Sequence, residues 1–202
     1  QAWFGSVMEL INNVTMLAIV LTGASLIRER EHGTVEHLLV MPVTPLEIMV
    51  SKIWSMAAVV TAASIFSLLA VVKGLLAVQI DGSLLLFFAG TVLHLFATTS
   101  MGIYLGTLAR SMPQFGLLMV LILLPLQMLS GGVTPRESMP IFVKMVMETA
   151  PTTHFVALAQ AILFRGAGIE VVWPQFLALT AISALLFGLS LTRFRRSIGM
   201  MA

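Results

Sequence analysis

The chain has 202 residues, of which 58% are hydrophobic and 10% charged, and its formal net charge is +2. Soluble domains carry about 25% charged residues, so this composition excludes an ordinary water-soluble domain and predicts a membrane protein. The absence of cysteine from the sequence also excludes disulfides, cysteine-based zinc sites and thiol nucleophiles.

Continuous apolar runs of about 20 residues, the length that crosses a bilayer as a helix, recur along the chain. They favour an all-α polytopic membrane protein over a β-barrel, whose strands alternate apolar and polar residues. The first predicted span covers 10–27, with Glu9 at its outer edge. A capping box at Thr44 predicts the start of the next helix, which lies along the membrane surface before it crosses at 53–72. The third predicted span covers 84–108.

The later apolar runs are broken. The run at 115–129 is only about 15 residues long, and Pro125 is expected to interrupt it. After "SGGVTPRESMP", a short amphipathic stretch at 141–148 and a helical piece at 156–164 follow. Irregular backbone is tolerated at membrane depth only where protein or a water-filled cavity covers it. We therefore expect a broken or re-entrant outer region and then a last span at 173–191 that a proline opens, giving about five transmembrane helices.

Lysine and arginine residues set the expected orientation. Five crossings would place the two ends of the chain on opposite sides of the membrane. One side carries the larger group of basic residues, namely Arg28, Arg30, Lys52, Arg110, Arg193, Arg195 and Arg196. The other side carries Lys73, Arg136, Lys144 and Arg165. The difference predicts that the first side, together with the C-terminus, is cytoplasmic.

The densest charge cluster, "REREHGTVEHLLVMP" at 28–42, separates the first two spans. Gly33 interrupts the first helix, and Thr34 can cap a short new helix whose Leu38 and Leu39 lie on one apolar face. The simpler alternative is a solvated loop whose arginines fix the topology. Because the acidic residues nearly cancel the bases, the pattern favours docking to a protein over binding to anionic lipid.

Two separated motifs resemble those of the ABC-2-type permeases, the membrane subunits of one class of ATP-driven transporters. The segment "LIREREHGTVEHLLVMPVTPLEIMVSKI" is similar to their coupling-helix segment, and "SGGVTPRESMP" with "APTTHFVALAQAILFRG" is similar to their second motif. The resemblance covers nearly the whole chain and is closest to the C-terminal membrane domain of fused ATP-binding/permease proteins called ribosome-associated ATPases. Ala150 stands where the family usually has asparagine, which concerns only a local cap. The residues that match the second motif are Ser130, Gly131, Pro135, Met139, Pro140, Pro151, Thr152 and Thr153.

The resemblance implies that residues 34–41 dock in a cleft of a nucleotide-binding domain and transmit ATP-driven motion. The phosphate-binding motif G-x-x-x-x-G-K-[ST] does not occur in this sequence. ATP and Mg²⁺ are therefore expected on a partner or on a fused upstream domain, and the chain itself is not expected to be an enzyme. The residues expected to couple to that ATPase are Arg28, Glu29, Arg30, Glu31, Gly33, Thr34, Glu36, Leu38 and Leu39.

The resemblance also predicts a wider assembly. Family members usually carry an earlier first span and an external domain, so residues 1–202 are expected to be a fragment of a permease domain. Members work as pairs, and an association with ribosomes is implied only by the closest resemblance. The predicted function is export of an unidentified substrate across a bacterial inner membrane. The alternative is a membrane anchor that tethers a fused ATPase without exporting anything.

Polar residues inside apolar runs are costly in lipid and often functional. Asn12, Asn13, His94 and Gln127 are candidates for a substrate path, and the alternative is that they form hydrogen bonds between helices. No metal site is predicted, because the histidines are scattered without ligand spacing. Catalytic motifs such as H-E-x-x-H and G-x-S-x-G are absent from the sequence.

A ridge of small residues at four-residue spacing, Thr98, Gly102 and Gly106, lies in the third predicted span. Such ridges let two helices approach closely. The ridge predicts either close packing within one protomer or part of a seam between two copies.

Overall fold

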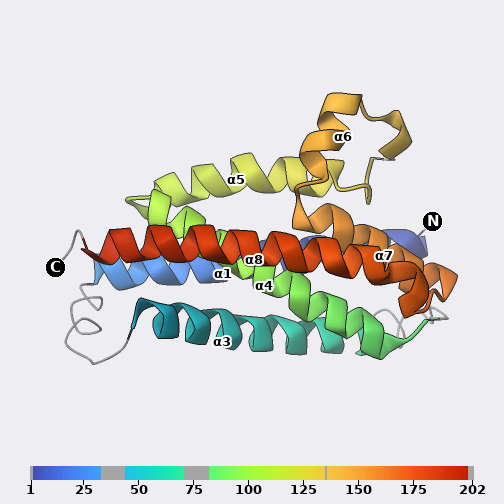
Figure 1. Cartoon of the computed structure of the whole chain (residues 1–202), viewed down its shortest axis with the longest axis horizontal. Helices are drawn as coiled ribbons and strands as arrows, with labels where there is room; N and C mark the ends of the chain where they lie inside the picture. Colours follow the sequence, from blue (N-terminus) through green and yellow to red (C-terminus); the bar gives the residue numbers. More distant parts are fainter. Residues whose placement is uncertain (1, 33–43, 71–81, 135, 200–202) are drawn as a thin grey trace.

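The computed structural model describes residues 2–32, 44–70, 82–134 and 136–199 of the chain, with the side chains of 5–197 within these ranges. Long helices run back and forth along one axis, and the two ends of the chain lie at opposite ends of the bundle (Figure 1). Among the described residues, five helices are long and apolar enough to cross a membrane. They are α1 (Ala2–Glu31), α3 (Pro45–Phe66, continuing as a wider turn to residue 70), α4 (Leu84–Leu108), α5 (Met112–Leu129) and α8 (Ile169–Gly199). The predicted class, an all-α polytopic membrane protein, is confirmed.

The start of α3 has the predicted capping geometry. Thr44 Oγ1 accepts a hydrogen bond from the Glu47 backbone N–H at 3.3 Å, and the Glu47 carboxylate accepts one from the Thr44 backbone N–H at 2.7 Å. Pro45 occupies the first helical position, where a backbone N–H would have had no helical partner. α1, in contrast, extends beyond the predicted 10–27 at both ends. It begins at Ala2, and at its other end the charged residues up to Glu31 continue the helix.

α4 lies at the centre of the bundle, where it contacts α1, α3, α5, α8 and α7 (Pro151–Arg165). Glycine lets α1 approach it closely, since a Cβ atom on Gly102 would lie 2.7 Å from the carbonyl oxygen of Ile19. α8 is also bonded to α4, because Ser190 Oγ donates to the Ser100 carbonyl oxygen at 2.7 Å. Small residues therefore bring the backbones of neighbouring helices together at the centre.

The continuity of α5 corrects one prediction. The helix runs without interruption from Met112 to Leu129, so the expectation that Pro125 interrupts it was wrong. A proline removes one helical hydrogen bond, and helices at membrane depth tolerate that loss where neighbouring groups compensate for it. Beyond the end of α5, Gly131 has φ +94°, a conformation open to glycine, and the chain turns there.

Beyond α5 the chain is broken into short pieces, in line with the predicted outer region. A 3₁₀ turn (η2, Arg136–Ser138) and α6 (Ile141–Met147) precede α7. α7 begins earlier than the predicted 156, because Pro151 serves as its first helical residue. α6 projects from the bundle at the end where α7 lies (Figure 1).

α8 is longer than the predicted 173–191 at both ends. It begins at Ile169, so Pro174 lies inside the helix and does not open it. The predicted opening was wrong because a proline near a helix start removes only one hydrogen bond, which the helix tolerates. At its other end α8 continues through the basic sequence "RFRRS" to Gly199.

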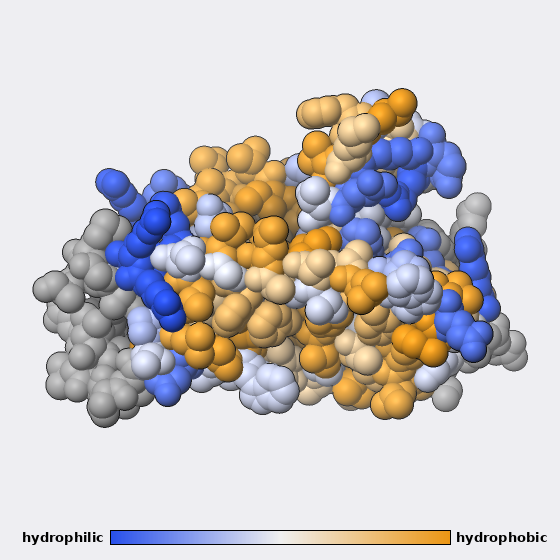
Figure 2. Space-filling model, in the orientation of Figure 1, coloured by the Kyte–Doolittle hydropathy of each residue, from blue (hydrophilic) through white to orange (hydrophobic). Residues whose placement is uncertain are grey.

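On the face shown in Figure 2, an apolar belt lies between hydrophilic residues toward the two ends of the bundle. The left end in Figure 1 holds the end of α1, the start of α3, the turn between α4 and α5 and the end of α8. The described residues of the larger basic group therefore share one end, and Arg136, Lys144 and Arg165 belong to elements at the other. Lys73 lies outside the described residues.

Candidate functional site

The larger basic group surrounds a polar network at one end of the bundle, which begins with an ion pair between α1 and α3. Lys52 Nζ pairs with the Glu29 carboxylate and donates to Ser25 Oγ at 3.4 Å. The Lys52 side chain is only 11% exposed, so solvent and salt screen this pair less than they screen a surface pair. The pair holds the first turns of α3 against the last turns of α1.

Arg30 extends the network to two further helices. Its Nη1 donates to the Ala109 carbonyl oxygen and its Nη2 to Ser197 Oγ, each at 3.1 Å. Ala109 is the residue that follows α4, and the last carbonyls of a helix lack helical donors and carry partial negative charge. Arg30 therefore supplies a cationic donor to the end of α4 and ties both α4 and α8 to α1.

An apolar cluster joins the same four helices. Its buried members come from α1, α3, α4 and α8 and are Leu26, Met49, Ile53, Ile103 and Phe194. Close-packed side chains transmit displacement because they leave no free volume to absorb it. Network and cluster together make this end of the bundle one packed unit, so a force on the connection between α1 and α3 would reach α4 and α8.

The predicted coupling residues lie partly within this network. Glu29 and Arg30 are half-buried and make the contacts above, whereas Arg28 and Glu31 are exposed to solvent. The other predicted coupling residues lie outside the described residues, so the short helix expected there stays a prediction; they are Gly33, Thr34, Glu36, Leu38 and Leu39.

Sequence reasoning missed four members of the network, namely Ser25, Lys52, Ala109 and Ser197. It gives Lys52 only a topological role, and nothing in the sequence singles out Ser25 or Ser197. For Ala109 a signal is present, because no glycine follows the third predicted span to cap its last carbonyls. The sequence thus leaves these carbonyls without a local cap, but it does not indicate which group supplies their donor.

The second motif surrounds a cavity of about 340 Å³ at the opposite end. Ser130, Gly131 and Thr153 line it, and the Gly131 carbonyl oxygen accepts a hydrogen bond from Gln160 Nε2 of α7 at 3.4 Å. The structure thus brings together residues from both halves of the motif. Of the rest, Pro135 lies outside the described residues, Pro140 is exposed at the start of α6, and the buried ones are Met139, Pro151 and Thr152.

The candidate substrate-path residues do not converge on one cavity. His94 is fully buried, where its Nε2 lies 2.9 Å from Thr15 Oγ1 and its ring stacks on Phe155 with centroids 4.3 Å apart. These contacts join α1, α4 and α7. For His94 they match the alternative to a substrate path, namely contacts that hold helices together. Asn13 lines a groove between α1 and α3, whereas Asn12 and Gln127 are half-buried on α1 and α5. A shared path through these residues stays a prediction.

The small-residue ridge is buried against α1 of the same chain. Thr98, Gly102 and Gly106 are all buried, and a Cβ atom on Gly106 would lie 3.1 Å from the Gly23 carbonyl oxygen. The ridge therefore serves packing within one protomer. A seam between two copies stays a prediction, and it would need surface from other helices.

Comparison with known proteins gives related sequences over the whole chain. Residues 3–164 match the family model described as ABC-2 type transporter. The chain is 68% identical over 201 residues, all of its length, to the inner membrane transport permease YhhJ of Escherichia coli K12, and it covers 54% of that relative. It is 29% identical over 199 residues to the probable multidrug ABC transporter permease YbhR of the same organism, with 97% of this chain and 53% of the relative covered. The chain thus spans about half the length of these relatives.

Proposed function

The chain belongs to the ABC-2 type transporter family, and we propose that it forms the membrane-spanning permease domain of an ATP-driven exporter. ATP and Mg²⁺ would be bound by a nucleotide-binding domain, either a separate subunit or a fused one. The connection between α1 and α3 would receive the motion of that domain, and the spans would convert it into export of a substrate. Two such permease domains would work as a pair.

The observation that carries this proposal is the polar network at the end of α1. The proposed coupling segment joins the last residue of α1 to the first residue of α3, and Glu29, Lys52 and Arg30 fasten those two helices to each other and to α4 and α8. A rotation or push at the segment would therefore move four spans together. A loop that served topology alone would need basic residues but no such linkage.

The orientation follows from the distribution of basic residues. The end that holds the network also holds Arg110 and the arginines near the end of α8, and cytoplasmic ends of membrane helices carry an excess of lysine and arginine. We place this end, with the C-terminus, in the cytoplasm of a bacterial cell, and the chain in its inner membrane. The location that the name of the E. coli relative states supports this assignment.

The test is a double substitution in the coupling segment, Glu36→Arg with Leu38→Asp, in the full-length protein assembled with its ATPase in lipid vesicles. The first change reverses a docking charge and the second removes an apolar contact. We expect the permease to insert and fold, while the permease-dependent part of ATP turnover is lost. Unchanged ATP turnover would overturn the coupling assignment.

A matched control places equivalent changes at the opposite end of the bundle. Ile169→Asp with Glu170→Arg alters two exposed residues in the first turn of α8 and should leave ATP turnover unchanged. A further substitution separates export from a membrane anchor that exports nothing. Gln127→Lys, a charge within the span of α5, should abolish transport by an exporter, but an anchor would tolerate it.

A further inference from the structure

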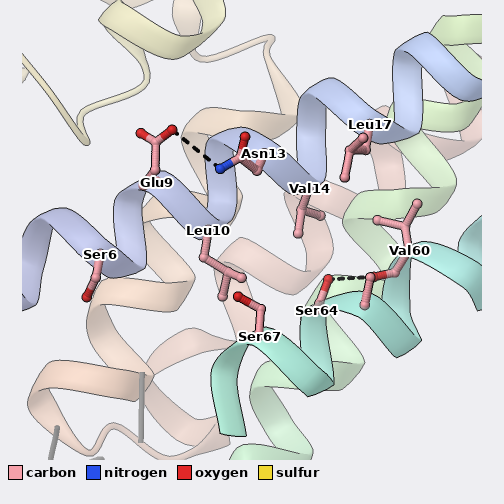
Figure 3. Close-up of a pocket in the computed structure, with 10 residues that line it drawn as sticks. Ser6, Glu9, Leu10, Asn13, Val14, Leu17, Val60, Ser64 and Ser67 are labelled. Carbon is pink, nitrogen blue, oxygen red and sulfur yellow. Dashed lines mark hydrogen bonds between the residues drawn. The ribbon is translucent and has the colours of Figure 1, made fainter. Parts of the chain in front are cut away.

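A groove of about 370 Å³ lies between α1 and α3, in the half of the bundle opposite the basic network. The residues of α1 that line it recur every three or four positions, and Leu10 and Val14 point toward α3 (Figure 3). The α3 wall is formed by Val60, Ala63, Ser64 and Ser67. Sites for small molecules are clefts of about 300–1,000 Å³ with mostly apolar walls and a few polar groups. This groove has that size and that character.

One carboxylate stands at the edge of the groove. Glu9 and Asn13 lie along one side of α1, with Glu9 directed away from α3 and Asn13 Nδ2 donating to Glu9 Oε1 at 3.4 Å (Figure 3). No lysine or arginine is among the described residues that line the groove. The negative charge of Glu9 is therefore not neutralised by the groove itself.

The position of Glu9 along α1 indicates how deep its charge lies in the membrane. Glu9 precedes Arg28 by about 19 residues, or roughly 28 Å along a helix. If Arg28 lies at one surface of a hydrocarbon layer about 30 Å thick, Glu9 lies close to the other surface. A carboxylate at that depth can pair with a cation from the interface, while the apolar part of the same molecule lies deeper against Leu10, Val14 and Val60.

We propose that this groove binds a lipophilic cation, with Glu9 as its counter-ion and the apolar walls of α1 and α3 around its hydrophobic body. An anionic amphiphile would be repelled by Glu9, and a neutral lipid chain would leave the carboxylate unpaired. That the bound cation is also a transported substrate rests on the proposed function. The binding site itself does not.

The experiment measures equilibrium binding of tritiated tetraphenylphosphonium to the full-length protein in lipid nanodiscs. We expect saturable binding that Glu9→Gln weakens by about tenfold or more, because one charged partner is lost. Glu170→Gln removes a carboxylate from the first turn of α8, outside the groove, and should leave binding unchanged. Tetraphenylborate, an anion of the same shape measured in separate samples, should not bind saturably.

A second variant tests the groove independently of the charge. Ser64→Leu adds volume to the α3 wall and should abolish tetraphenylphosphonium binding while Glu9 is retained. Equal binding by wild type and Glu9→Gln, or no saturable binding by the wild type because another part of the longer protein fills the groove, would overturn the site. If the binding test fails but Glu36→Arg with Leu38→Asp still abolishes ATP coupling, the binding site is refuted and the proposed function is retained. If the cation binds as expected but the double substitution leaves ATP turnover unchanged, the binding site is retained and the proposed function is refuted.

Discussion

Arg30 offers the sharpest test of the network at the end of α1. Arg30→Met keeps an unbranched, apolar stem, although a shorter one, and removes the charge and all the donors of the side chain. Two hydrogen bonds from a charged group are lost, and the Ala109 carbonyl oxygen loses its donor from α1. Such bonds contribute about 1.5–3 kcal/mol each when enclosed. Because Arg30 is half-buried and water replaces part of the loss, we expect the free energy of unfolding to fall by about 2–3 kcal/mol.

The assay is reversible unfolding in mixed micelles, followed by circular dichroism. The neighbouring exposed arginine supplies the control, because Arg28→Met should change the free energy of unfolding by less than about 0.5 kcal/mol. A double-mutant cycle with Ser197→Ala isolates the contact with α8, and we expect a coupling energy of about 1 kcal/mol. If Arg30→Met and Arg28→Met destabilise equally, the network does not hold the four helices together.

Two further predictions concern contacts between helices. Exchanging the charges of the half-buried ion pair, Glu29→Lys with Lys52→Glu, should recover at least half of the stability that Lys52→Glu alone removes, measured by the same unfolding assay. No recovery would mean that the two side chains do not interact. Gly102→Ala should lower the free energy of unfolding by about 1–3 kcal/mol, because its Cβ atom meets the backbone of α1. In the matched Gly116→Ala variant the Cβ atom meets nothing within 4 Å, so equal losses in both variants would refute the close approach of α1 and α4.

The sequence predicts the features of this fold that are local. The capping box at Thr44 depends on residues three apart in the chain, and it appears with the expected hydrogen bonds. The predicted spans follow from the length of each apolar run. The two misjudged prolines, Pro125 and Pro174, each remove one helical hydrogen bond, and both helices continue through them.

The contacts that build the candidate site were not predictable in the same way. Arg30 reaches Ala109 and Ser197, which lie far along the chain in two other helices. Periodicity places Arg30 at the end of an apolar run, but it cannot say which helix ends will be its neighbours. For the same reason, spacing identifies the ridge around Gly102 and cannot decide whether its partner is α1 or a second copy.

The central claim is that the connection between α1 and α3 docks on an ATPase. A photo-crosslinking amino acid in place of Glu36, in the full-length protein assembled with its nucleotide-binding domain in membranes, tests it most directly. The same amino acid in place of Glu170, in the first turn of α8 at the opposite end of the bundle, is the control. We expect a crosslink to the nucleotide-binding domain from position 36 and none from position 170. No crosslink from position 36, or equal crosslinking from both positions, would contradict the claim.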